Sequence, residues 1–160
     1  MNEANGVTVT PYSKENPIVV KWFDTMAEVI KGIDKNHLIT LSLTGDVYSE
    51  NGVYYPWKRA YSSPYADILQ IHAYGFAAGE QYIRGLLTTY FKEMKAFKKA
   101  IFVGEFAPEK SNKQRTKLLR KALELGKKNN IPMFLWTHRF DSFGELTDDD
   151  IKVYRDTYHK

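Results

Sequence analysis

Four side chains that could take part in chemistry stand at the ends of short apolar runs: Glu105, His72, Tyr74 and Trp136. A carboxylate can act as a nucleophile or as a general acid–base group, and an imidazole or a phenol can orient it through hydrogen bonds. Charged residues are rarely buried unless they are paired, so Glu105 is unusual within an apolar run. The alternatives are a structural salt bridge for Glu105, a hydrogen-bonded core position for His72, and plain core packing for the two aromatic residues.

A second carboxyl group, Glu3, follows Asn2 near the start of the sequence. It precedes the first apolar run by about one strand–helix interval, so it falls where the end of an earlier strand is expected. Two carboxyl groups, one protonated and one ionised, form the pair with which a glycosidase cleaves a sugar linkage. A glutamate near the start of a chain is otherwise an ordinary solvated surface residue.

The apolar runs themselves predict the elements that hold these side chains. Four runs rich in Ile, Leu, Val and aromatic residues start 30, 33 and 31 residues apart. Compact runs of this kind are typical of strands buried on both faces of a parallel sheet. The predicted strands are 37–43, 67–74, 100–106 and 131–137.

Helical patterns fill the intervals between the runs. Apolar residues recur at three- and four-residue steps over 17–33, 80–97 and 112–129, and Thr147 opens a last short helix with an acidic first turn. Asn16 is a suitable N-cap for the first of these helices. Alternating strands and helices imply a parallel sheet with right-handed crossovers.

Two architectures fit this alternation: an open doubly wound sheet, or part of a (β/α)₈ barrel. A full barrel takes about 250 residues, and this chain has 160, which is enough for half of one. In a barrel the strand ends converge on the face that holds the active site. Glu105, His72, Tyr74 and Trp136 would then lie on one rim.

Composition excludes several other classes of function. The chain is 43% hydrophobic, carries a formal net charge of only +4 and has no cysteine, so it lacks both disulfides and thiolate metal ligands. It contains neither a phosphate-binding glycine motif nor a paired-histidine zinc motif. No apolar run is long enough to span a membrane, and the first ten residues show no signal-peptide pattern. We expect no cofactor, no metal, no nucleic acid partner and no membrane partner.

The motifs resemble the second half of a clan A glycoside hydrolase, and are most similar to family 5, the family of cellulases and mannanases. The similarity runs through the whole chain in order, although Ala4 stands where the family usually has proline after Asn-Glu. The matching residues are Asn2-Glu3, His37–Thr40 in the predicted first strand, His72-Ala73-Tyr74, Gly104-Glu105-Phe106 and Trp136.

The resemblance implies a role for each residue. Glu105 would be the nucleophile and Glu3 the acid/base of a retaining mechanism. Asn2 would contact the substrate 2-hydroxyl, with His72 beside it in the substrate site. Tyr74 would donate a hydrogen bond to Glu105, and Trp136 would form the floor beneath the sugar at the cleavage point. The aromatic residues of 44–66, Tyr48, Tyr54, Tyr55, Trp57 and Tyr61, would either bind sugar faces or pack on a neighbouring helix.

The resemblance also sets expectations for the molecule. We expect one (β/α)-repeat region over residues 1–160, a half-barrel that lacks the first strands of the barrel and acts on a β-linked glycan of the cellulose or mannan type. The open sheet edges would favour association with the missing half-barrel or with a second copy. An extracellular, periplasmic or cell-surface setting follows from a polymeric substrate. A carbohydrate-binding fragment without turnover and an unrelated open α/β domain remain the alternatives.

Overall fold

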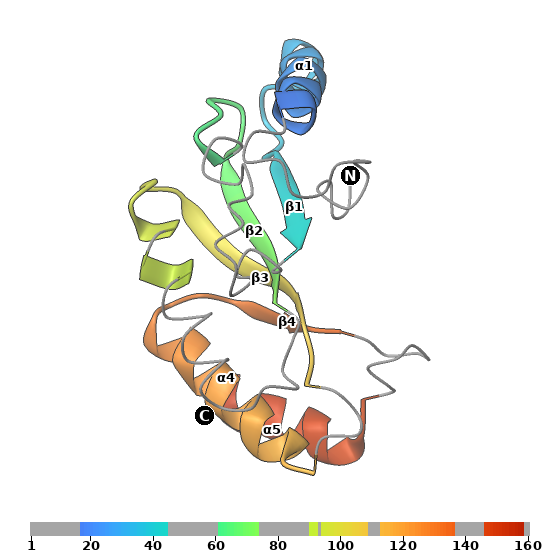
Figure 1. The fold of residues 1–160 in the computed structure, drawn as a ribbon, viewed down its shortest axis with the longest axis vertical. Helices are drawn as coiled ribbons and strands as arrows, with labels where there is room; N and C mark the ends of the chain where they lie inside the picture. Colours follow the sequence, from blue (N-terminus) through green and yellow to red (C-terminus); the bar gives the residue numbers. More distant parts are fainter. Residues whose placement is uncertain are drawn as a thin grey trace. The chain divides into compact units, whose positions relative to one another are not determined.

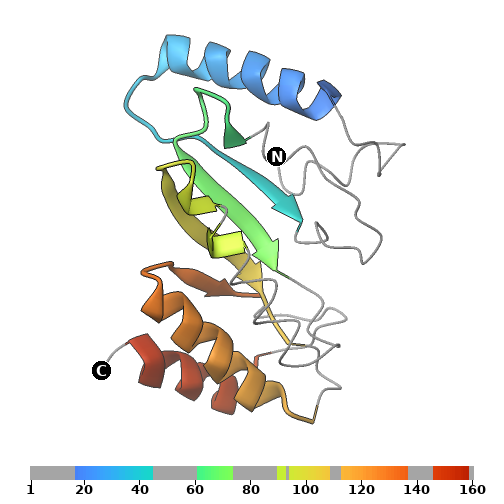
Figure 2. The ribbon, with the colours of Figure 1, turned by 60° about the vertical axis from the view of Figure 1, so that its left-hand side comes forward.

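The structure is a computed structural model that describes residues 17–44, 61–73, 90–92, 94–108, 113–136 and 146–158. The chain forms two compact units, one of residues 1–72 with 94–102 and one of residues 73–93 with 103–160. Figures 1 and 2 show the order of the elements along the chain. The labelled elements are α1 (Pro17–Ile33), β1 (Thr40–Thr44), β2 (Ile68–Ala73), β3 (Ala100–Phe106), α4 (Arg115–Lys128), β4 (Met133–Leu135) and α5 (Asp148–Tyr158).

The strands form the predicted parallel sheet, in the order β1-β2-β3-β4. In the first unit β1 pairs with β2 in parallel, with Thr40 opposite Ile68 and Ser42 opposite Gln70. In the second unit β3 pairs with β4 in parallel. Since sequential strands are neighbours and point the same way, the α/β prediction is confirmed.

Three strands begin later than the sequence predicts, β2 by one residue and β1 and β4 by more, and the local chemistry explains the two larger differences. The carboxylate of Asp34 accepts hydrogen bonds from the backbone amides of Asn36 and His37, so the chain is still turning there and β1 begins at Thr40. The amide of Ile131 donates to Gly126 O of the preceding helix at 2.9 Å. Pro132 has no amide proton to donate to a ladder, and β4 therefore begins at Met133.

The strands also differ in burial. Leu69, Ile71, His72 and Ala73 of β2 have no exposed surface, as expected for a strand covered on both faces. Phe134 of β4 is instead 52% exposed. Full burial on both faces therefore holds for the end of β2 and not for β4.

Helix α1 has the bounds that its apolar spacing predicts, but the apolar residues lie on two sides. Val20, Phe23 and Ala27 are buried, whereas five other large apolar side chains of the helix are more than one-third exposed. An apolar surface this wide is typical of a helix with more than one packing partner. The exposed set is Trp22, Met26, Val29, Ile30 and Ile33.

In the second unit α4 and α5 pack against each other and lie side by side in Figure 2. The start of α5 confirms Thr147 as its cap: Thr147 N donates to Asp150 Oδ2 at 3.0 Å, and Asp150 N donates to Thr147 Oγ1 at 3.2 Å. This reciprocal pair satisfies two backbone donors at the helix terminus. At the end of α4, Asn130 takes the left-handed conformation, with φ 56°, which asparagine tolerates better than most residues.

The helix predicted over 80–97 is described only near its end. Residues 90–92 and 94–95 are helical, and a turn follows. Lys98, with φ 55°, has the left-handed backbone that ends it. The rest of this helix, and the predicted cap Asn16, lie outside the described residues.

Candidate active site

Strands β1 and β2 present a polar face and an apolar face. Successive side chains of a strand point to opposite sides of the sheet, so Gln70 and His72 share one side of β2 while Leu69 and Ile71 share the other. Leu69 and Ile71 are fully buried. Ser42 joins the polar side because it lies opposite Gln70 in the ladder. A parallel sheet with a polar face of this kind can place hydrogen-bonding groups toward a ligand.

His72 is the centre of a hydrogen-bond network on this polar face. The ring is 0% exposed, and its Nε2 lies 2.7 Å from Ser42 Oγ and 3.0 Å from Gln70 Nε2. An amide nitrogen only donates, so Nε2 accepts a hydrogen bond and the proton of the neutral ring is on Nδ1. His72 is thus a hydrogen-bonded buried residue at the end of a strand, held in one orientation by its neighbours.

Glu105 lies within an irregularity of β3 in the second unit. Val103 pairs with Met133, and Phe106 pairs with Leu135, so β3 advances by three residues while β4 advances by two. Gly104 and Glu105 therefore face a single residue of β4, which is the arrangement of a β-bulge. Bulges are frequent beside active sites because they turn a side chain away from its regular direction.

The burial of β3 agrees with this placement. Val103 and Phe106 have no exposed surface, while Glu105 between them is only partly buried. The bulge leaves the carboxylate at the C-terminal end of the strand, at the edge of the core. In a parallel α/β fold this end of the strands is where active-site residues lie.

Trp136 is fixed next to this bulge. Its backbone N donates to Phe106 O at 3.0 Å, which joins it to the residue directly after Glu105. The Trp136 side chain is 37% exposed. The structure therefore brings Glu105 and Trp136 to the same ends of two adjacent strands, as the sequence predicted.

An ion pair fixes the chain beyond Glu105. Arg115 Nη1 donates to Pro108 O at 2.9 Å, and Arg115 Nε donates to Asp150 Oδ2 at 3.0 Å. Asp150 is fully buried and Arg115 nearly so. One guanidinium thus links the segment after β3 to the first turns of α4 and α5, which restricts movement of the strand end that carries Glu105.

Three of the predicted site residues lie outside the described residues: Asn2, Glu3 and Tyr74. Of the other three, His72 belongs to the first unit, whereas Glu105 and Trp136 belong to the second.

One aromatic residue has a packing role. Tyr61 is fully buried, meets the Phe97 ring edge-on at 6.3 Å and donates its hydroxyl hydrogen bond to Gln70 O. Burial raises its pKa. Of the two alternatives for the aromatic residues of 44–66, packing therefore holds for Tyr61. The other four lie outside the described residues: Tyr48, Tyr54, Tyr55 and Trp57.

Sequence reasoning missed the polar residues that support the predicted site. Ser42 and Gln70 interrupt apolar strands, and Gln70 stands two residues before His72, on the same side of the strand. The two-residue spacing of Gln70 and His72 is the feature of the sequence that could have predicted this polar face. The sequence contains no comparable pattern for the Arg115–Asp150 ion pair. The two residues are 35 positions apart, and each has the sequence context of an ordinary charge on a helix surface.

Metal binding and membrane insertion find no support in the described part of the chain. No group of three or more His, Cys, Asp or Glu side chains among the described residues could hold a metal ion. No helix in the described ranges has the length and apolar character of a membrane span.

Comparison with known proteins identifies the family. The sequence matches the family model described as Cellulase (glycosyl hydrolase family 5) over residues 1–142. This chain belongs to glycosyl hydrolase family 5. The unrelated open α/β domain is therefore excluded. A search of curated protein sequences gave no significant match.

Solved structures of similar fold include two mannanase structures from Thermotoga petrophila. The endo-beta-1,4-mannanase structure has a TM-score of 0.71 and 20% sequence identity to this chain. The match covers 91% of this chain and 40% of the mannanase chain. The hyperthermostable endo-1,4-beta-D-mannanase of strain RKU-1, solved with maltose and glycerol, has a TM-score of 0.71 and 17% sequence identity. That match covers 92% of this chain and 53% of the mannanase chain. The chain thus spans about half the length of these barrel enzymes, and its fold is a parallel (β/α) half-barrel.

Proposed function

We propose that this family 5 chain carries the nucleophile side of the active site of a retaining β-glycan hydrolase, with Glu105 as the nucleophile. The observation that carries the proposal is the bulge at Gly104-Glu105, which leaves a partly buried carboxylate at the C-terminal end of β3, next to Trp136. Family membership supplies the reaction class.

The chemistry divides between two carboxyl groups. A Glu105 oxygen bonds to the anomeric carbon while the glycosidic C–O bond breaks, and Glu3 gives its proton to the departing oxygen. In the second step a water loses a proton to Glu3, its oxygen bonds to the anomeric carbon, and the ester bond to Glu105 breaks. Both carboxyl groups thereby return to their starting states.

The remaining predicted residues bind and orient the sugar. Trp136 presents an exposed indole beside the nucleophile, and an aromatic face suits the apolar face of a sugar ring. Asn2 would contact the 2-hydroxyl, Tyr74 would donate to Glu105, and His72 would belong to the substrate site as a buried, hydrogen-bonded ring. The substrate we propose is a β-linked glycan of the mannan or cellulose type, which places the protein in an extracellular, periplasmic or cell-surface setting.

A second candidate is a carbohydrate-binding half-barrel without turnover. The observation that favours it is length: the chain covers 40% and 53% of the two mannanase structures. Such a chain would use the exposed Phe134 and Trp136 side chains, 52% and 37% exposed, to bind sugar.

Turnover and binding measured together separate the two candidates. We would assay hydrolysis of β-mannan and β-glucan oligosaccharides, and their affinity, for the chain and for Glu105→Gln. The hydrolase account predicts a fall in turnover of about a thousandfold or more with affinity changed only a few-fold. Affinity with no turnover in either protein would favour the binding account. The matched control is Glu124→Gln, on the exposed side of α4.

A further inference from the structure

The segment that follows Glu105 is buried and is held at both of its ends. Phe106 has no exposed surface, and Pro108 is buried as well. Phe106 O accepts a hydrogen bond from Trp136 N at 3.0 Å, and Pro108 O accepts one from Arg115 Nη1 at 2.9 Å. The backbone directly after Glu105 is thus fixed by one bond from the end of β4 and by one from the first residue of α4.

The guanidinium that makes the second of these bonds has another fixed contact. Arg115 Nε donates to Asp150 Oδ2 at 3.0 Å. Asp150 lies in the first turn of α5, where the same oxygen accepts from Thr147 N at 3.0 Å. A guanidinium presents its donors in a rigid, planar fork, so the position of Asp150 sets the direction of the bond to Pro108. One side chain therefore joins the start of α5 to the segment after β3.

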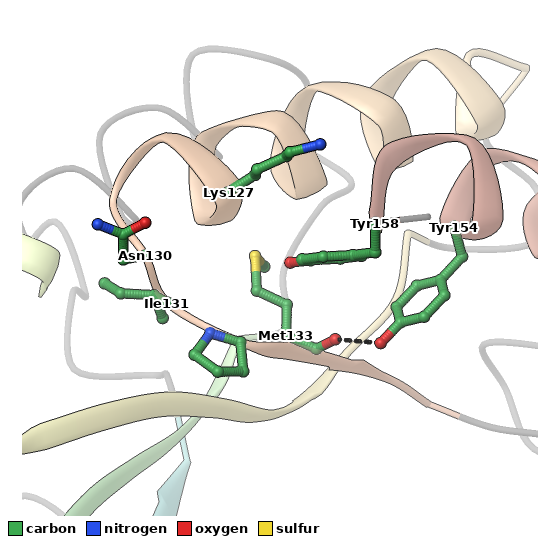
Figure 3. A pocket seen from close by; sticks show the side chains of 7 residues that line it. Lys127, Asn130, Ile131, Met133, Tyr154 and Tyr158 are labelled. Carbon is green, nitrogen blue, oxygen red and sulfur yellow. Dashed lines mark hydrogen bonds between the residues drawn. The ribbon is translucent and has the colours of Figure 1, made fainter. Parts of the chain in front are cut away.

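The two helices are also anchored at their other ends. Lys127 Nζ, in the last turn of α4, donates to Thr157 O of α5 at 2.6 Å. Figure 3 shows this part of the second unit, with the hydrogen bond from the Tyr154 hydroxyl of α5 to Met133 O of β4, 3.2 Å long, drawn as a dashed line. Since α4, α5 and β4 are joined here, the ion pair at the starts of the helices is held within a fixed frame.

The stability of the fold alone does not explain a buried ion pair of this kind. Asp150 is 0% and Arg115 8% exposed, and Asp150 Oδ1 has no hydrogen-bond partner among the described residues. Removal of one partner is destabilising because it leaves the other charge buried and unpaired, yet replacement of both partners by uncharged side chains is often neutral. The directional bonds of the pair, in contrast, suit a role in placing the segment after β3.

We propose that Arg115 is a positioning residue for Glu105: its bond to Pro108 O holds the bulge at the end of β3 in the geometry from which the carboxylate attacks. The inference rests on the proposed function of Glu105 as the nucleophile. Attack requires the reacting atoms to lie about 3–3.5 Å apart and aligned, and a displacement of about 1 Å can lower the rate about a hundredfold. A loosened segment after Glu105 therefore slows the chemical step more than it weakens binding.

The first test compares hydrolysis of β-mannan and β-glucan oligosaccharides by the whole chain and by Arg115→Lys. Lysine keeps a positive charge beside Asp150 but has one ammonium group in place of the fork, so it cannot make both bonds in the same geometry. We expect kcat to fall by about tenfold or more, with KM changed by less than about threefold. Arg120→Lys, the same change at an exposed residue of α4, is the control and should leave both constants unchanged.

A second comparison separates positioning from stability. Arg115→Met combined with Asp150→Asn removes both charges, so that no charge is left buried and unpaired, and keeps a side-chain oxygen that can accept from Thr147 N. Thr147→Ala lowers stability through the α5 cap but leaves the bond to Pro108 O in place. At a temperature where urea denaturation shows every variant to be folded, we expect the double variant to lose kcat as Arg115→Lys does, and Thr147→Ala to keep it.

Hydrogen exchange of the Trp136 amide gives a readout that needs no turnover. This amide donates to Phe106 O, so it should exchange faster in Arg115→Lys and in the double variant, and at an unchanged rate in Arg120→Lys. Unchanged exchange, unchanged kcat in both Arg115 variants of an active chain, or an equal fall in kcat for Thr147→Ala would overturn this inference and leave the role of Glu105 intact. Absence of hydrolysis by the unmodified chain would overturn the proposed function, and this inference with it.

Discussion

At the scale of single residues, the polar side chains at the strand ends differ in how their surroundings hold them. His72 is closed in by Ser42 and Gln70 and has no exposed surface. Glu105 is only partly buried and stands in a bulge. A closed-in imidazole suits a fixed hydrogen-bond donor, whereas a carboxylate at the core edge suits a group that contacts substrate.

The His72 network makes a prediction about its tautomer. Because the amide of Gln70 donates to Nε2, the neutral ring carries its proton on Nδ1. Nitrogen NMR of the imidazole rings at mildly alkaline pH should show His72 as the Nδ1–H form, with His72→Gln identifying the resonance. Ser42→Ala should keep this tautomer because Gln70 still donates. An Nε2–H ring in the unmodified chain would contradict the described network.

The sequence predicted which strand end carries each of these residues but not their partners. The apolar runs are local patterns, so the order of residues alone assigns Glu105 and Trp136 to strand ends. The bulge depends on how β3 pairs with β4, and the Ser42–His72 contact joins residues 30 positions apart. Pairings of that kind are not encoded in local periodicity.

At the scale of elements, a few polar contacts, buried or partly buried, join helices to strands. In the second unit Arg115 and Asp150 connect α4, α5 and the segment after β3. In the first unit Asp67, just before β2, accepts from Lys31 of α1 at 2.8 Å and from Ile39 N at 2.8 Å. Both clusters fix the termini of elements that carry site residues.

The Arg115–Asp150 pair should be important for stability. Asp150→Ala removes both the partner of a buried guanidinium and the α5 cap, and we expect a loss of about 3–5 kcal/mol in the free energy of unfolding. Thr147→Ala removes only one side of the cap and should cost about 1 kcal/mol. Urea denaturation of the two variants measures both. A smaller loss for Asp150→Ala than for Thr147→Ala would contradict the structure.

The Asp67 cluster should make the first unit sensitive to acid. The hydrogen bond from Lys31, with that from Ile39 N, lowers the pKa of Asp67 below its usual 3.8. A lowered folded-state pKa contributes stability that is complete above the unfolded pKa and is lost as pH falls through the folded value. Asp67→Asn should therefore cost about 1 kcal/mol at neutral pH and progressively less below about pH 4.

Denaturant unfolding at several pH values tests this expectation. Glu28→Gln, an exposed change on α1, is the control and should leave the pH profile as it was. An Asp67→Asn profile that stays parallel to that of the unmodified chain from neutral to acid pH would show that the carboxylate charge does not stabilise the fold.

At the scale of the whole molecule, the fold class and the family could be predicted from the sequence because they depend on the order and spacing of motifs along the chain. The regular strand intervals indicated a parallel α/β sheet, and the motifs that resemble family 5 favoured the half-barrel over an open doubly wound sheet. The family match and the sheet order confirm this fold. The two-sided apolar surface of α1 was not accessible from the sequence. It depends on which faces of the helix the neighbouring elements leave uncovered.

The central claim is that Glu105 is the nucleophile, and covalent trapping tests it most directly. A 2-deoxy-2-fluoroglycosyl fluoride forms the glycosyl ester without needing a proton from the acid/base, so the test isolates this carboxylate. We predict that mass spectrometry finds one sugar on the peptide that contains Glu105, and none with Glu105→Gln. A label on another residue, or undiminished labelling of Glu105→Gln, would contradict the account.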